Sequence, residues 1–114
     1  MRRTIPVLLC AIFFASPALG EPIASRDAAF YVGEAVTVKG RAFLTYMPSG
    51  EIYIDLDGRS DGAPISAYIS RWNRGLFQDV STLDGKMVEV SGQIGVFRDR
   101  PEIFLQDPRQ LTSK

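Results

Sequence analysis

Alternation of apolar and polar residues with a period of two runs through most of the chain after residue 34. This period places successive side chains on opposite faces, as in a β-strand with one buried face. Five runs of this kind occupy 35–44, 52–57, 65–70, 88–96 and 103–105. Turn-forming residues separate them, for example Pro48, Ser49 and Gly50 after the first run. The pattern predicts five strands, with Val38, Ile54, Ile69, Val90 and Ile103 as buried residues, one from each.

One stretch between the third and fourth runs has the spacing of a helix instead. Its apolar residues are Leu76, Phe77, Val80 and Leu83. Intervals of one, three and three suit a short amphipathic helix. Asn73 stands where it can cap the start of that helix, and Gly85 suits the position after its end.

Glycines interrupt two of the predicted strands and indicate how the sheet closes. Gly40 lies within the first run and Gly92 within the fourth, where a long strand can bend or bulge. Three strands, a helix and two further strands follow the plan of the OB-fold, and closure removes exposed strand edges. The predicted fold is mainly β, a five-stranded OB-fold Greek-key barrel with one short helix between strands 3 and 4. An open meander with one covering helix is the alternative.

Residues 1–20 have the features of a secretory signal peptide. Arg2 and Arg3 precede an apolar run over 5–14, and the small residues Ala18 and Gly20 occupy the positions that a signal peptidase inspects. The run is too short for a membrane-spanning helix. We expect cleavage after Gly20, a periplasmic or secreted location and no membrane span in the mature form. A buried core helix and twin-arginine export are the alternatives.

The remainder of the chain is predicted to form one domain. Residues 21–30 contain a proline and no periodicity, which predicts a flexible leader, and 31–114 form the OB-fold domain. Cys10 is the only cysteine and leaves with the signal peptide, so the mature chain has no disulfide. Without Arg2 and Arg3, eleven basic residues remain of thirteen, against thirteen acidic ones, a net charge of −2.

No pattern of catalytic residues is present in the sequence. The absence of histidine excludes histidine general bases and histidine metal ligands. In 55–62 the glycine falls at position four of a would-be calcium loop and Ser66 at position twelve, which does not match an EF-hand. We therefore expect a protein that is not an enzyme and that has no metal and no cofactor.

Three segments resemble those of small exported bacterial OB-fold proteins. YVGEAVTVKG at 31–40 is similar to their first strand, and GKMVEVSGQI at 85–94 to their helix exit and fourth strand. PEI at 101–103 and LQDP at 105–108 are similar to their final strand. The resemblance covers roughly 31–111. It implies an OB barrel of the kind described as nucleic-acid-binding domains, and a related exported group is associated with envelope stress.

OB domains bind through the face of strands two and three and through the one-two and four-five loops. The candidate ligand-binding residues on these elements are Lys39, Arg41, Phe43, Tyr46, Tyr53, Tyr68, Phe97, Arg98 and Arg100. Rings interleaved with cations suit single-stranded nucleic acid, since each base stacked on a ring contributes about 1–3 kcal/mol. Oligosaccharides also pack on aromatic rings. The alternative is that these side chains serve only packing and solubility.

Two functions follow as hypotheses. The first is an exported non-enzymatic binding module for single-stranded nucleic acid or another extended ligand. The second is a protein-interaction or envelope-stress module that binds a partner protein.

Asp55 and Asp57 are expected on the binding face, where they would repel phosphate. Trp72 is expected to plug one end of the barrel, with the lip of a binding site as the alternative.

Overall fold

The computed structural model describes residues 20–114. The predicted signal peptide lies outside this range except for Gly20. The strands are β1 (Ile23–Ala24), β2 (Ala35–Tyr46), β3 (Ile52–Leu56), β4 (Ile65–Ile69), β5 (Met87–Phe97), β6 (Arg100–Leu105) and β7 (Leu111–Ser113). The 3₁₀ helices are η2 (Ser25–Tyr31), η3 (Ser60–Gly62), η4 (Arg74–Leu76), η5 (Val80–Leu83) and η6 (Pro108–Gln110).

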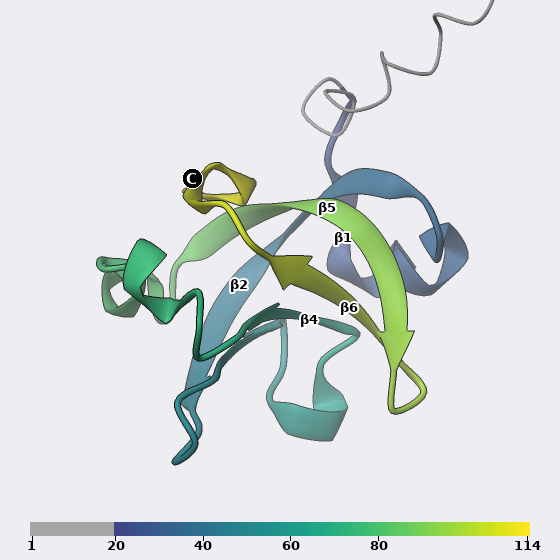
Figure 1. The fold of residues 1–114 in the computed structure, drawn as a ribbon. Helices are drawn as coiled ribbons and strands as arrows, with labels where there is room; N and C mark the ends of the chain where they lie inside the picture. Colours follow the sequence, from purple (N-terminus) through teal and green to yellow (C-terminus); the bar gives the residue numbers. More distant parts are fainter. Residues whose placement is uncertain (1–19) are drawn as a thin grey trace, which may run out of the picture.

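Five of these strands close into a barrel (Figure 1). The order is β2-β3-β4-β6-β5, and β5 pairs back onto β2. The β4–β6 pairing is parallel, and the other four pairings around the barrel are antiparallel. The prediction of a closed barrel is thus confirmed over an open meander, and the barrel is consistent with an OB-like fold.

The two longest strands change partner next to a glycine. β2 pairs with β5 up to Arg41 and with β3 from Ala42 onward. β5 pairs with β2 up to Gln93 and with β6 from Ile94 onward, and Figure 1 shows its curvature. Gly40 and Gly92, which the sequence marks as positions where the strands can bend, therefore lie next to the points where each strand leaves one neighbour for the next.

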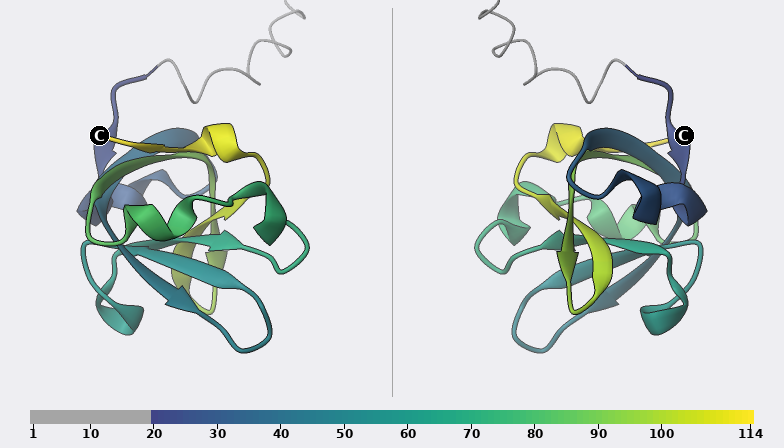
Figure 2. Two further views of the ribbon diagram at one scale, coloured as in Figure 1. Left: turned by 90° about the vertical axis from the view of Figure 1, so that its left-hand side faces the viewer. Right: turned by 90° about the vertical axis from the view of Figure 1, so that its right-hand side faces the viewer.

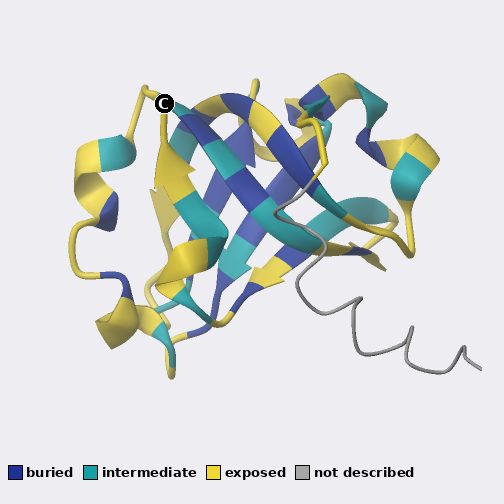
Figure 3. Cartoon of the chain, turned by 90° about the horizontal axis from the view of Figure 1, so that it is seen from above, coloured by how far each residue is buried: buried dark blue, intermediate teal, exposed yellow. Residues whose placement is uncertain are grey.

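The barrel interior is filled by the inward-facing residues of the alternating runs. The five predicted core residues, Val38, Ile54, Ile69, Val90 and Ile103, are each at most 1% exposed. Buried and more exposed residues alternate along the strands in Figure 3. The prediction that these five side chains face the interior of the barrel is therefore confirmed.

The predicted flexible leader is instead packed against the barrel, so the expected boundary between leader and domain at residue 31 is wrong. β1 pairs in parallel with β2, and η2 buries Ala28 completely. The Ser25 hydroxyl donates to Asp57 Oδ2 at 2.5 Å, and the Arg41 backbone N–H donates to Asp57 Oδ1 at 2.8 Å. A two-residue strand and a single 3₁₀ helix are too short to produce a periodic pattern, which explains the error.

The predicted amphipathic helix is also wrong in form. The chain between β4 and β5 makes two separate 3₁₀ turns, η4 and η5, and the Asn73 side chain does not cap the first. Phe77 and Val80 are buried, whereas Leu76 is 53% exposed. Phe77 and Val80 therefore attach the segment between β4 and β5 to the core, and its apolar residues do not form one continuous buried face. Figure 2 shows these turns beside the barrel and the β2–β3 hairpin projecting away from the C-terminus.

The sequence pattern missed the C-terminal elements. Asp107 begins η6 with a capping box that includes Gln110, and Pro108 occupies the first turn. β7 then pairs with β5 from Val88 to Val90. Among residues 20–114, no helix combines the length and apolar character needed to span a membrane.

Candidate functional site

Three aromatic rings form a row across the outer face of β3, β4 and β6. The strand registers place Tyr53 beside Tyr68 and Tyr68 beside Phe104. The ring centroids are 5.1 Å apart for the first pair and 5.6 Å for the second, with interplanar angles of 50° and 31°. Neighbouring rings are in contact with each other. A planar ligand group would therefore lie over the row, because no space remains between its rings.

Phe104 is the member of this row that the sequence interpretation missed. The pattern places Ile103 and Leu105 inward, so it already implies that Phe104 points outward. What it does not supply is the parallel pairing of β4 with β6, which joins residues distant in the sequence. That pairing puts the exposed Phe104 ring next to Tyr68.

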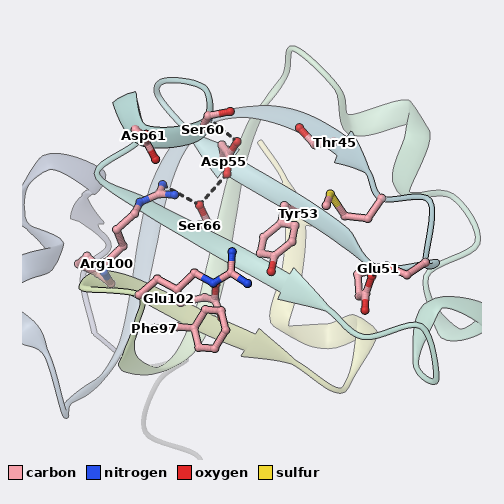
Figure 4. A pocket seen from close by; sticks show the side chains of 14 residues that line it. Thr45, Glu51, Tyr53, Asp55, Ser60, Asp61, Ser66, Phe97, Arg100 and Glu102 are labelled. Atoms are coloured by element: carbon pink, nitrogen blue, oxygen red, sulfur yellow. Dashed lines mark hydrogen bonds between the residues drawn. The ribbon is translucent and has the colours of Figure 1, made fainter.

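A pocket of about 420 Å³ adjoins the row. Figure 4 shows it from close by, with Tyr53 and Phe97 among its lining side chains. The β2–β3 loop, β3, the β3–β4 loop and the β5–β6 hairpin all contribute to its wall. Its lining includes Met47, Ser49, Glu51, Tyr53, Asp55, Ser60, Asp61, Ser66, Phe97, Arg98, Arg100, Pro101 and Glu102. The two loops that the OB plan names for binding thus meet at one pocket.

One wall of the pocket is a hydrogen-bonded polar network centred on Asp55. This carboxylate is 4% exposed and accepts from the Ser66 hydroxyl at 2.6 Å and from the Ser60 backbone N–H at 2.9 Å. Arg100 Nη2 donates to the Ser66 hydroxyl at 3.3 Å and to the Ala63 carbonyl at 3.2 Å. The Arg100 guanidinium therefore stabilises the wall of the pocket through these hydrogen bonds, whereas Arg98 is exposed.

The network corrects the expectation that Asp55 and Asp57 both lie on the binding face, where they would repel phosphate. Asp55 lines the pocket, but it is buried and both of its oxygens have donors. Asp57 follows the end of β3 with a φ of 59°, and it accepts hydrogen bonds from Ser25 and Arg41. Alternation stops where β3 stops, so the sequence pattern placed Asp57 wrongly.

The pKa values of two glutamates at the site, Glu51 and Glu102, are shifted in opposite directions. The Ser49 hydroxyl donates to the Glu51 carboxylate, and this bond is the main reason that the pKa of Glu51 lies below its ordinary value. Burial raises the pKa of Glu102, against the influence of Arg100 and Arg98, which lower it. Burial also raises the pKa of the Tyr53 hydroxyl, which therefore keeps its proton near neutral pH and can donate a hydrogen bond.

Replacing Glu102 by glutamine is expected to stabilise the protein near pH 7 and to have little effect below the ordinary glutamate pKa of 4.5. Because the folded-state pKa is raised, the folded protein binds this proton more tightly than the unfolded chain. The stability that this provides is complete below 4.5 and is lost as the pH rises through the folded-state pKa. Glutamine removes the ionisation and so avoids that loss.

Melting temperatures of wild type and Glu102→Gln across this pH range measure the effect. The difference should grow in favour of the variant as the pH rises. A constant difference at every pH would show that Glu102 acts through the shape and packing of its side chain, and that its ionisation has no part.

Guanidinium groups cover four aromatic rings outside the central row. The pairs, with the distance from Cζ to the ring centroid, are Arg59 and Phe43 at 4.8 Å, Arg71 and Trp72 at 4.5 Å, Arg74 and Tyr46 at 5.4 Å, and Arg98 and Phe97 at 5.2 Å. All four distances are within the range of cation–π attraction. The predicted mixture of rings and cations is therefore present as contacting pairs.

The structure brings six of the nine predicted residues to this side of the barrel. Tyr53, Phe97, Arg98 and Arg100 line the pocket, Tyr68 contacts Tyr53, and Phe43 lies opposite Asp55 on the outer face of β2. Tyr46, at the end of β2, lies opposite the buried Ile52 and so is on the other face of the strand. Lys39 and Arg41 do not lie with these six residues. They lie on the half of β2 that pairs with β5, where Arg41 Nη1 donates to the Gly85 carbonyl at 2.6 Å.

The predicted role of Trp72 as a plug of the barrel is wrong. Its side chain is 79% exposed, in the turn that follows β4. Phe77 and Val80 from the segment after it are buried in the core cluster instead. The turn leaves the barrel before Trp72, so the largest side chain of the segment points outward.

No three acidic, cysteine or histidine side chains within residues 20–114 gather so that they could hold a metal ion. The segment 55–62 forms the end of β3 and a turn with η3. Two of its residues, Asp57 and Ser60, have positive φ angles.

Comparison with known proteins reveals a likeness of fold alone. No family model and no curated protein matches the chain. A crystal structure from Leishmania major Friedlin, of a protein assigned as an aspartyl-tRNA synthetase, is similar over 82% of this chain, with a TM-score of 0.54 and 11% sequence identity. This chain spans 20% of the length of that protein. The likeness supports the assignment of an OB-like barrel.

Proposed function

We propose that this chain is an exported, non-enzymatic OB-fold module that binds single-stranded nucleic acid across the outer face of β3, β4 and β6. The observation that carries the proposal is the row of Tyr53, Tyr68 and Phe104 beside the exposed Arg98 of the β5–β6 hairpin. This is the face through which OB domains bind. Export rests on the signal-peptide features of residues 1–20.

The row suits a ligand that presents one flat group after another. Rings in contact offer a continuous apolar surface, and bases can stack over it without sequence preference. Phe104 is 45% exposed, and both tyrosines are partly exposed. Arg98 is exposed and has no carboxylate partner among the salt bridges of residues 20–114, so it is available to a phosphate.

Carboxylates at the edge of the row limit the affinity for a polyanion. Glu51 is ionised near neutral pH, and its pKa lies below its ordinary value because of the Ser49 hydroxyl; Glu102 borders the pocket. We therefore infer modest affinity, with the phosphates on the side of Arg98 and the bases over the rings.

Binding of a partner protein is the second candidate, and an apolar surface favours it. Val96, Phe97 and Phe104 are 58%, 49% and 45% exposed and line a shallow hollow on the far side of Glu102. Exposed apolar groups that cluster are typical of protein-interaction sites. A protein that used this hollow would contact the β5–β6 hairpin without needing the tyrosines.

Replacing Arg98 by serine is expected to weaken the binding of a twelve-nucleotide oligodeoxythymidine several-fold and to reduce the salt slope of binding by about 0.7, the value for one phosphate on a single strand. Fluorescence anisotropy with a labelled oligonucleotide at several salt concentrations measures both quantities. Arg109→Ser is the matched control, since Arg109 is also exposed but pairs with Asp107 at 2.7 Å in η6.

The control variant should bind as the wild type does. If the wild-type protein has no salt-dependent affinity for the oligonucleotide, the nucleic-acid proposal is wrong. Chemical-shift titrations with oligosaccharides and with candidate protein partners then distinguish the remaining ligands.

A further inference from the structure

Trp72 is 79% exposed in the turn that follows β4 and is not part of the core cluster. We propose that Trp72 and Arg71 form a second stacking platform for the same single-stranded nucleic acid. The ligand would then run from the β5–β6 hairpin, over the tyrosines, to the turn after β4. This inference rests on the proposed function and extends its site to residues outside the loops and strands named so far.

Trp72 offers an open ring face. The side chain is 79% exposed, and the Arg71 guanidinium lies over its ring at 4.5 Å from the centroid. A cation can cover only one face of an indole, so the other face is open to a base. Exposed single apolar residues are common, but an indole held in place by a neighbouring guanidinium is already oriented for stacking.

Arg71 connects Trp72 to the row. Burial raises the pKa of the Tyr68 hydroxyl, and the charge of Arg71 acts against that shift. Arg71 likewise lowers the pKa of Glu51, after the larger effect of the Ser49 hydroxyl. The guanidinium that covers Trp72 is thus close enough to influence two groups at the edge of the tyrosine row.

The platform is held against the β2–β3 loop, which lines the pocket. A β-carbon placed on Gly50 would lie 3.0 Å from Arg71 Cβ, so Arg71 packs directly on this glycine. Arg74 Nη1 donates to the Gly50 carbonyl at 3.3 Å and covers Tyr46. These contacts fix the turn after β4 to the loop.

The arrangement matches a repeating chain of bases and phosphates. On one side of the tyrosines, Arg98 covers Phe97 and acts on the pKa of Tyr53. On the other side, Arg71 covers Trp72 and acts on the pKa of Tyr68. A guanidinium over a ring can pair with a phosphate while the free face of the ring stacks on a base. One such pair lies on each side of the row.

The intrinsic fluorescence of Trp72 tests the inference directly, since it is the only tryptophan in the sequence. Titrating the protein with the twelve-nucleotide oligodeoxythymidine should quench the tryptophan emission, with the same midpoint that anisotropy measures. Trp72→Leu should weaken binding about 5-fold or more, and Trp72→Phe should recover part of that loss because it restores a ring. Phe30→Leu is the control, since this ring is 81% exposed on η2, outside the proposed path.

Melting temperatures of the variants should equal that of the wild type, because the replaced side chains are exposed. An oligonucleotide that binds while the tryptophan emission and the affinity of Trp72→Leu stay unchanged would overturn this inference and leave the proposed function intact. Equal losses in Trp72→Leu and Trp72→Phe would overturn the stacking role. A wild-type protein without oligonucleotide affinity would overturn both proposals.

Discussion

Replacing Ile54 by alanine is expected to lower the free energy of unfolding by about 3–4 kcal/mol. Ile54 is fully buried and lies in the middle of β3, between Leu44 of β2 and Ala67 of β4. A closed barrel cannot collapse around a missing side chain without moving strands that are hydrogen-bonded on both edges. The loss therefore combines the transfer free energy of the removed atoms with that of the cavity. Chemical denaturation of the two proteins measures the difference.

Tyr53→Ala provides the matched comparison, one residue earlier on the opposite face of the same strand. Tyr53 is partly exposed and contacts Tyr68 across the strands, so we expect a loss near 1 kcal/mol. If the tyrosine variant proved the less stable of the two, the assignment of inner and outer faces of β3 would be wrong.

Replacing Gly92 by alanine is expected to cost about 2–4 kcal/mol, although it adds only one methyl group. The new β-carbon would lie 2.7 Å from Ile103 Cγ2 and 3.0 Å from Gln110 Nε2. Ile103 is buried in the core and has little freedom to move. The φ of Gly92 is +155°, a backbone conformation that residues with a side chain rarely adopt. Steric overlap and backbone strain therefore add together.

Gly95→Ala, three residues further along β5, is the control. The nearest atom to its added β-carbon is the Glu102 carbonyl oxygen at 3.9 Å, so this substitution should be nearly neutral or slightly stabilising. Thermal or chemical unfolding of the two variants compares them. Equal effects would show that β5 adjusts its backbone at Gly92, and that the change of partner strand does not require a glycine there.

The alternation of apolar and polar residues predicts some features of the candidate binding site and not others. Alternation indicates that Tyr53 and Tyr68 point outward, and the antiparallel pairing of the consecutive strands β3 and β4 makes them neighbours. It does not indicate that Phe104 completes the row, because that contact depends on the parallel pairing of β4 with β6. It also does not indicate that the Asp55 carboxylate is enclosed by Ser66 and Ser60. Both facts depend on which segments meet in the closed barrel.

The predictions for Lys39, Trp72 and the N-terminal leader differ from the structure for the same reason, which is that they depend on contacts between distant parts of the chain. Lys39 and Phe43 share one face of β2 in the sequence pattern, but the strand changes partner between them and carries the two side chains to different parts of the barrel. Trp72 has the largest side chain of the segment between β4 and β5, yet the turn that contains it lies outside the barrel and leaves this side chain exposed. Ala28 has no periodic neighbours, yet it is fully buried.

By itself, the sequence determined the five strands of the barrel, their buried faces and the glycines at which β2 and β5 can bend. These properties arise within a few residues, from the period-two geometry of an extended chain and from the absence of a side chain on glycine. Only the tertiary structure decided which outward side chains form the tyrosine row, that the leader belongs to the domain, and that Trp72 is exposed. Those outcomes depend on contacts between residues far apart in the chain, and local alternation carries no information about which distant strand becomes the neighbour.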